Sequence, residues 1–352
     1  MEYIKSVNSL QFEISSNCNL KCTGCARINE EDLDTVGSLI KKNVYLDKNV
    51  IMDLFRSKEL QNLTYVDFCG SIDDPLMHPD FLEIVEFITS LKLKIVVQTN
   101  ASLRNSDYWI RLANILKANP TSYVKFSIDG LKDTNHLYRR GSNWNKIISN
   151  ASAYINAGGH AQWQYIVFPW NQHQVEDARV LSQQMGFDSF RYRHDRGGVP
   201  SNDAEKQKKI QKYKNSLQLS WNDLTSYYDE QASDDEIKCY AQSEQQFFIT
   251  HEGLVWPCCF LHNGKYRQLE RWKEYTDRFD LHYEKNWNSL YYHSFDTIFN
   301  HEFYQSNLIQ SWESKTHGVG KCDRLLRCTQ SCSKKTTTIK PHLVITNKKE
   351  TI

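Results

Sequence analysis

The feature that most constrains the fold is an alternation of short strand-like runs and longer amphipathic stretches between residues 10 and about 195. Runs rich in β-branched and aromatic residues predict strands at 10–15, 64–69, 94–98, 123–127, 162–168 and 189–193. Helices are predicted near 47–57, 79–91, 106–117, 143–157 and 173–185. Crossover helices of this length join parallel strands. The pattern predicts an α/β fold, a partial (β/α)6 barrel, because a closed eight-fold barrel needs about 250 residues.

A second module is predicted after this region. A lysine-rich run, EKQKKIQKYK, marks 201–235 as a linker; it is read as a solvated face rather than a nucleic-acid patch. From about 236, strands at 246–250 and 254–256 flank a hairpin turn at His251-Glu252-Gly253. We therefore expect a barrel domain at 1–200 and a small C-terminal α+β domain at 236–340. The polar, threonine-rich chain after Cys332, including a tail at 341–352, is expected to be loosely ordered.

Charge and cysteine content limit the compartment and the partners. Lys plus Arg number 43 against 42 Asp plus Glu, so no overall field attracts nucleic acid or an anionic membrane. The N-terminus lacks a long apolar signal region, and no window approaches 18 apolar residues. We expect a cytoplasmic protein that has neither a membrane partner nor a nucleic-acid partner. Its 10 cysteines are then better explained as metal ligands than as disulfides.

The first cysteine group is Cys18-x3-Cys22-x2-Cys25, directly after the first predicted strand. Sites in parallel sheets form at the carboxyl ends of the strands, where this loop lies. Three thiolates can hold a four-iron cubane by three corners and leave one iron open, whereas an ordinary electron carrier uses four cysteines. A zinc loop is the alternative, but no fourth Cys or His follows closely.

This loop resembles the signature of the radical S-adenosylmethionine superfamily, in which an aromatic residue usually stands where this chain has Gly24. Four later segments are similar to the family's motifs, in order. They are FCGSIDDPLMHP at 68–79, like the GGEP segment but without its glycine pattern; TN at 99–100; SIDG at 127–130; and HLYRRG at 136–141. The resemblance implies a cofactor site for S-adenosylmethionine formed by Gly70, Asp74, Pro75, Asn100, Ser127, Asp129, and Arg139 or Arg140. An arginine there would pair with the cofactor carboxylate.

The second cysteine group resembles an auxiliary-cluster module. Cys239-x13-Gly253-x4-Cys258 is similar to the opening half of the SPASM domain, and Cys322, Cys328 and Cys332 supply three closing cysteines. Val319 stands where a further cysteine is usual and none follows Cys332, so the module resembles the shorter twitch domain with one auxiliary [4Fe–4S] cluster. The implied ligands are Cys239, Cys258 and Cys332, with either Cys328 or Cys322 as the fourth. A structural zinc ribbon is the alternative.

Two further cysteines are not expected to be ligands. Cys259 neighbours Cys258, and adjacent residues of an extended chain point to opposite faces. Cys69 lies on an apolar strand and is better explained as a small buried hydrophobe.

The resemblance implies an enzyme in which Cys18, Cys22 and Cys25 hold a [4Fe–4S] cluster that cleaves S-adenosylmethionine to a 5′-deoxyadenosyl radical. That radical would take hydrogen from a peptide, protein side chain or small molecule. A flavodoxin or ferredoxin would supply the electron. The polar loop His194-Asp195-Arg196-Gly197-Gly198 is a candidate substrate contact. A non-catalytic iron–sulfur electron carrier and a zinc-stabilised binding module are the alternatives.

Overall fold

The computed structural model describes residues 3–28, 40–69, 71–168, 170–194, 236–262, 277–333 and 343–346. Gly70, the predicted linker, and the loop from Asp195 onward lie outside the described residues. The strands are β1 (Ser9–Phe12), β2 (Tyr65–Phe68), β3 (Lys94–Thr99), β4 (Tyr123–Ser127), β5 (Ala161–Val167), β6 (Ser189–His194), β7 (Gln246–Ile249), β8 (Val255–Trp256) and β9 (Leu343–Thr346).

The helices of the first part are α1 (Lys48–Leu54), α2 (Phe81–Ser90), α3 (Ser106–Leu116), α4 (Asn135–Tyr138), α5 (Trp144–Asn156) and α6 (Val175–Gln184), with short 3-10 turns at Lys58–Leu60, Pro75–Met77 and Gln172–Gln174. The later helices are α8 (Tyr240–Ser243), α11 (Phe295–Phe299), α12 (Leu308–Glu313) and α13 (Leu326–Cys332), with a π-helical turn at Phe303–Asn307. Among the described residues, no helix is long and apolar enough to cross a membrane.

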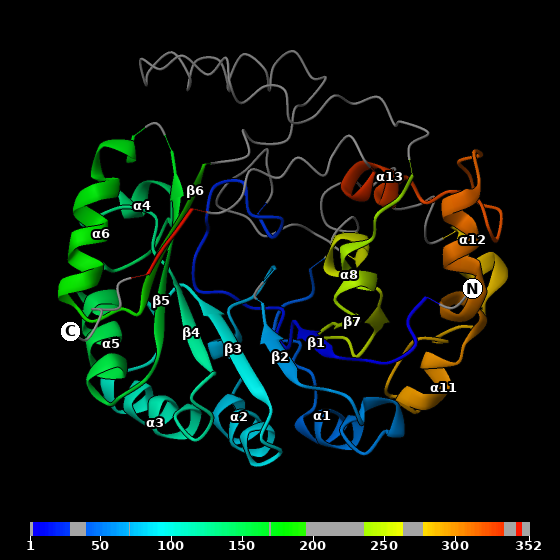
Figure 1. The fold of residues 1–352 in the computed structure, drawn as a ribbon, viewed down its shortest axis with the longest axis horizontal. Coiled ribbons are helices and arrows are strands. Elements are labelled where there is room, and N and C mark those ends of the chain that lie inside the picture. Colours follow the sequence, from blue (N-terminus) through cyan, green and yellow to red (C-terminus); the bar gives the residue numbers. More distant parts are fainter. Residues whose placement is uncertain are drawn as a thin grey trace.

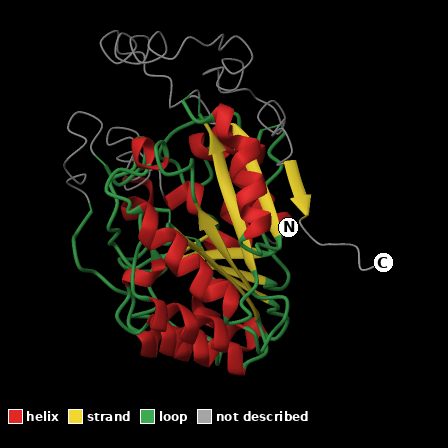
Figure 2. Cartoon of the chain, turned by 90° about the vertical axis from the view of Figure 1, so that its left-hand side faces the viewer, coloured by secondary structure: helices red, strands yellow, loops and turns green. Residues whose placement is uncertain are grey.

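All the strands lie in one sheet, in the order β8-β7-β1-β2-β3-β4-β5-β6-β9. Neighbours from β7 to β6 pair in parallel, and the two edge strands β8 and β9 are antiparallel. Figure 1 shows the strands fanning along an arc with helices along its outer side, and Figure 2 shows helices in front of the strands when viewed from that side. The mostly parallel sheet confirms the predicted α/β fold.

Aromatic packing fixes which face of the sheet meets the helices. Phe68 of β2 packs edge-on against Phe81 of α2, with ring centroids 5.2 Å apart. Phe126 of β4 stacks on Trp109 of α3 at 5.3 Å. Because side chains alternate along a strand, the residues next to Phe68 in β2 and next to Phe126 in β4 point to the opposite face. We call this opposite side the inner face.

Local sequence signals set the helix starts. The Asn105 side chain accepts a hydrogen bond from the Tyr108 backbone N–H at the start of α3, and Asn143 does the same for Lys146 at the start of α5. Both are N-caps, which satisfy backbone donors that the first helical turn leaves free. The predicted helices therefore begin within two residues of the positions expected.

Two edges of the sheet differ from the sequence expectation. The hairpin at His251-Glu252-Gly253 is present, but β7 also pairs in parallel with β1, so the C-terminal hairpin extends the main sheet. The tail was expected to be loosely ordered, and this was wrong for Leu343–Thr346. That run forms β9 against β6 because LVIT carries three β-branched residues, which favour strands, and the threonine-rich stretch before it obscured the signal.

Candidate active site

The loop that carries Cys18, Cys22 and Cys25 leaves the carboxyl end of β1 and is held by backbone hydrogen bonds. The N–H of Lys21 donates to the carbonyl of Arg140 at 3.0 Å, and that of Thr23 donates to the carbonyl of Tyr138 at 3.1 Å. Within the loop, the N–H of Cys25 donates to the Cys22 carbonyl at 3.1 Å. The HLYRRG segment, distant in sequence, therefore fixes the shape of the cysteine loop.

Cys18, Cys22 and Cys25 are half-buried thiols rather than disulfides. Burial raises the pKa of Cys18, with the nearby Asp74 adding to the effect. Burial also raises the pKa of Cys22 to about 11, although the positive charge of Arg139 opposes it. Thiolates here need further positive charge, which iron would supply, so the donor chemistry fits a cluster. In the described part of the chain, no three His, Cys, Asp or Glu side chains are placed to hold a single metal ion.

Asp74 joins three of the predicted segments. Its carboxylate accepts hydrogen bonds from the backbone N–H groups of Leu76 and Asn100 and from the Thr99 hydroxyl, at 2.8–3.1 Å. Its own N–H donates to the Asn17 carbonyl at 2.9 Å, just before the cysteine loop. Burial raises the Asp74 pKa, and these hydrogen bonds oppose that rise. The SIDDP segment, the end of β3 and the cysteine loop are thereby tied together.

Asn100 extends this connection to a thiol. Its side-chain nitrogen lies 3.7 Å from the Cys18 sulfur and 2.9 Å from the side-chain oxygen of Asn19. Pro75 opens the buried 3-10 turn that follows Asp74. The structure thus brings Asp74, Pro75 and Asn100 of the predicted set beside Cys18.

A second group of predicted residues lies beside Cys22. Asp129, fully buried, accepts a hydrogen bond from the Ile166 N–H at 2.6 Å and forms an ion pair with Arg139, whose Nη2 is 2.7 Å from Oδ2. Burial raises the Asp129 pKa, and the Arg139 charge opposes this. Ser127, half-buried, ends β4. The two adjacent arginines thus differ: the Arg139 side chain is anchored at the site, while the Arg140 carbonyl holds the cysteine loop.

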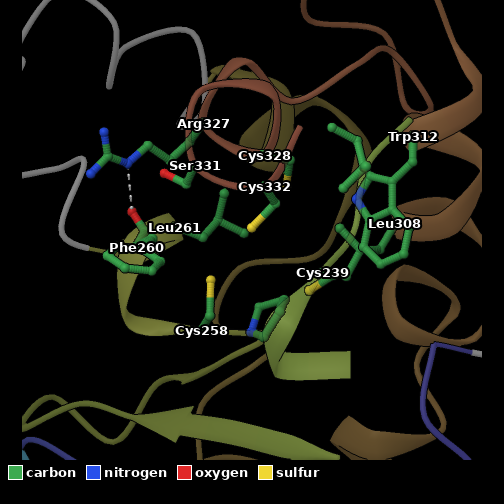
Figure 3. A pocket seen from close by; sticks show the side chains of 12 residues that line it. Cys239, Cys258, Phe260, Leu261, Leu308, Trp312, Arg327, Cys328, Ser331 and Cys332 are labelled. Atoms are coloured by element: carbon green, nitrogen blue, oxygen red, sulfur yellow. Dashed lines mark hydrogen bonds between the residues drawn. The ribbon is translucent and has the colours of Figure 1, made fainter. Parts of the chain in front are cut away.

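Part of the second cysteine group lines a cavity together with residues of α12 and α13. Four of its cysteines, Cys239, Cys258, Cys328 and Cys332, contribute to the lining (Figure 3). In Figure 3 the sulfurs of Cys239, Cys258 and Cys332 point toward the shared space. These three residues precede α8, follow β8 and end α13, and together with Cys328 in the same lining they fit the four-cysteine donor set of a cluster.

The remaining cysteines lie outside the lining. The Cys322 sulfur is 3.1 Å from the Gln310 side-chain oxygen. The Cys259 sulfur is 3.8 Å from the Tyr240 hydroxyl, and Cys69 is packed against the core.

Around the cavity, the thiols influence one another. The Cys332 thiol donates to Cys239, which lowers the Cys239 pKa to about 7. Burial raises the pKa of Cys258 and of Cys328, the latter to about 12. The Tyr3 hydroxyl lies 3.9 Å from the Cys239 sulfur, so the N-terminal segment also borders this region.

Sequence reasoning missed a buried carboxylate cluster that follows the carboxyl ends of β1 and β2. Glu13, fully buried at the end of β1, has Oε1 3.3 Å from Nδ1 of His251 and accepts from the Ile72 N–H at 3.1 Å. Asp73 accepts from the Ser15 N–H at 3.0 Å, and its other oxygen is buried without a hydrogen-bond partner among the described residues. A glutamate in the apolar run LQFEI was the available signal, because charged residues are seldom buried without a purpose.

Comparisons with known proteins bear on the first part of the chain most directly. Residues 12–181, just under half of the chain, match the Radical SAM superfamily. The cysteine-type anaerobic sulfatase-maturating enzyme of Clostridium novyi (strain NT) is 30% identical over 160 residues. That match covers 42% of this chain and only 40% of the relative's length.

Solved structures show the same fold. The structure of anSMEcpe with bound AdoMet has a TM-score of 0.52 and 17% identity, and covers 94% of this chain and 86% of that one. Streptococcus suis SuiB bound to S-adenosylmethionine has a TM-score of 0.51 and 15% identity, over 74% of this chain and 62% of that one. These likenesses concern the fold alone. The family match and the relative support an enzyme that is similar to radical SAM enzymes over residues 12–181.

Proposed function

We propose that this enzyme binds a [4Fe–4S] cluster through Cys18, Cys22 and Cys25 and cleaves S-adenosylmethionine reductively. When bound, the cluster supplies one electron that breaks a carbon–sulfur bond, and the resulting 5′-deoxyadenosyl radical takes hydrogen from a substrate. The observation that carries this proposal is a loop of three thiols at the carboxyl end of β1, inside the radical SAM domain and beside Asp74, Asn100 and Arg139.

The chain's own residues would position the cofactor. Asp74 and Asn100 hold the strand ends against the cysteine loop, so the polar backbone there is pre-organised for the cofactor's amino group and ribose. Ser127 and Asp129 end β4 on the same edge, and Gly70, Pro75 and Arg140 complete the proposed contacts. Arg139 is the better candidate for the cofactor carboxylate, because its ion pair with Asp129 fixes the guanidinium near Cys22.

We also propose one auxiliary [4Fe–4S] cluster in a twitch/SPASM-like domain at 236–340, which follows a linker at 201–235 and the barrel domain at 1–200. The cavity supports Cys239, Cys258, Cys328 and Cys332 as its ligands. Cys322 was the other candidate that the sequence left open, but it lies outside the lining and contacts Gln310. The auxiliary cluster would accept the substrate radical's electron or bind the substrate.

The proposed substrate is a peptide, a protein side chain or a small molecule, and the outcome is a net oxidation or a bond-forming modification. A peptide is favoured by the relative that matures sulfatases and by the fold shared with anSMEcpe, which has been solved with AdoMet and the Cp18Cys peptide bound. A flavodoxin or ferredoxin would supply the electron.

The test is reductive cleavage by the full chain, reconstituted anaerobically with iron and sulfide. With dithionite and S-adenosylmethionine, the wild type should form 5′-deoxyadenosine and methionine. The Cys22→Ala variant should lose this activity by about a hundredfold or more, because the cluster loses a corner. Cys259→Ala, a cysteine outside both proposed ligand sets, is the matched control and should retain it.

Two results would contradict the proposal. One is an iron-loaded wild type that forms no 5′-deoxyadenosine, as expected of an electron carrier. The other is a colourless protein that binds zinc and no sulfide.

A further inference from the structure

The inner face of the sheet is polar along β4, β5 and β6. Phe126, Trp163 and Phe190 pair in register and face the helices, since Phe126 stacks on Trp109. Alternation therefore turns Lys125, Gln162 and Arg191 toward the inner face. An ordinary barrel interior is filled by branched apolar side chains, so charged residues at these positions need a separate explanation.

Two of these side chains have buried atoms without a hydrogen-bond partner among the described residues. They are the side-chain oxygen of Gln162 and the Nε of Arg191. Gln162 is only 5% exposed, and its amide nitrogen already donates to the Ser189 hydroxyl at 2.8 Å. Leaving a buried polar atom unpaired costs about 1–3 kcal/mol, so natural sites with such atoms usually meet a ligand or water.

The positive charge of this face is also incompletely balanced. Lys125 Nζ is 3.9 Å from Asp67, but both oxygens of that carboxylate accept from Gln98 at 3.0–3.2 Å. Within the described part of the chain, Arg191 forms no ion pair. A partly buried guanidinium without a carboxylate is a strong attractor for an anion.

These residues lie directly below the proposed cofactor site. Lys125 precedes Ser127, the end of β4, by two residues on the same face, which is about 7 Å along a strand. Lys125 and Gln162 are cross-strand partners. Arg191 is a diagonal neighbour of Gln162, within reach of a long side chain. A molecule bound by these side chains would therefore extend toward the cysteine loop.

We propose that the inner face of β4–β6 binds an acidic peptide segment of the substrate, with Arg191 and Lys125 taking its carboxylate and the Gln162 oxygen accepting a backbone N–H. This inference rests on the proposed function and narrows its substrate class. A peptide suits the site because it offers an anion and an N–H donor a few ångströms apart. A phosphate would place further negative charge against the Gln162 oxygen.

The test measures binding to the cluster-loaded full chain by anaerobic calorimetry without reductant. The probes are a hexapeptide of alternating Glu and Gly, its Gln counterpart, and inorganic phosphate. The Glu peptide should bind at least about tenfold more tightly than the Gln peptide, and Arg191→Gln should remove most of that difference. Arg191→Lys should retain part of it. Arg179→Gln, the same change at an exposed pair with Glu176, should leave binding unchanged.

Equal binding of the Glu and Gln peptides, no detectable binding of either, or an unchanged preference in Arg191→Gln would overturn the inference. Phosphate binding that depends on Arg191, without Glu-peptide binding, would overturn it in favour of a phosphorylated small molecule. Lys125→Gln decides the question if Arg191→Gln does not fold. Because no reductant is present, the result is independent of cofactor cleavage. Selective binding with no cleavage would sink only the proposed function, and cleavage without selective binding would sink only this inference.

Discussion

Cys328 and Cys322 differ in where the fold places them relative to the proposed auxiliary cluster. In the sequence both fit the fourth place of the auxiliary ligand set. In the structure Cys328 lies four residues before Cys332, so both face the same side of α13 and line one cavity. Cys322 precedes that helix and contacts Gln310 instead. The spacing of the cysteines alone could not distinguish Cys322 from Cys328, because the path of the chain between residues 258 and 322 determines which sulfur lies at the cavity.

We therefore expect different iron contents from the two alanine variants. Cys328→Ala should lose the auxiliary cluster, about four irons per chain, because three thiolates hold it less well than four. Cys322→Ala should keep them. Iron and sulfide analysis of anaerobically reconstituted protein measures both. Equal iron loss in the two variants, or loss in Cys322→Ala alone, would reverse the ligand assignment.

The buried Asp73 carboxylate destabilises the folded state when it is charged. Burial raises its pKa well above the ordinary value, and the nearby Glu13 and Asp74 carboxylates add to the rise. The folded state therefore binds a proton more tightly than the unfolded chain does. Stability from this group is present below the unfolded pKa, near 4, and is lost as the pH rises through the folded pKa.

Asp73→Asn should remove this loss of folding stability at high pH. Its side-chain oxygen can still accept from the Ser15 N–H, while the buried charge is gone. At pH 8 we expect a gain on the order of 1 kcal/mol in the free energy of unfolding, shrinking toward pH 4. Anaerobic urea unfolding across this pH range measures it. The control is Asp53→Asn, whose side chain is 62% exposed. A variant less stable than the wild type at pH 8 would contradict the account.

At the scale of elements, the turn after β4 depends on one glycine. Gly130 has φ of +142°, and a Cβ there would lie 2.7 Å from the Asn135 backbone nitrogen and closer still to the Thr134 hydroxyl. This turn presents Asp129 to Arg139. The backbone conformation and the close approach both exclude a side chain.

Gly130→Ala should lower the free energy of unfolding by about 2 kcal/mol or more. Gly158→Ala is the matched control: its φ is +87°, but nothing lies within 4 Å of the added Cβ. It should cost only about 1 kcal/mol, the backbone contribution. Thermal unfolding of both variants measures the difference. Equal losses would mean that the contacts at Gly130 do not matter.

Most elements of the first part could be predicted because their signals are local. Alternation and N-caps placed β1 to β6 and their helices within a few residues. The pairing of β7 with β1 could not be predicted, since register between strands more than 200 residues apart leaves no periodic trace in either strand. The LVIT run of β9 was missed because of the polar stretch before it, and its pairing with β6 could not be predicted from the sequence.

For the whole molecule, the pairing of β7 with β1 joins the C-terminal hairpin to the strand that precedes the first cysteine group. Glu13 and His251, from the two predicted domains, meet within 3.3 Å. The motifs indicated both groups, whereas this adjacency and the polar inner face follow only from the assembled sheet.

The central claim is an iron held by Cys18, Cys22 and Cys25 that no side chain occupies and that S-adenosylmethionine binds. The most direct measurement is electron–nuclear double resonance on the reduced, reconstituted chain with S-adenosylmethionine labelled with ¹⁵N in its amino group. We predict a ¹⁵N coupling to the cluster that disappears in Cys22→Ala and persists in Cys328→Ala. No coupling in an iron-loaded wild type would contradict the account.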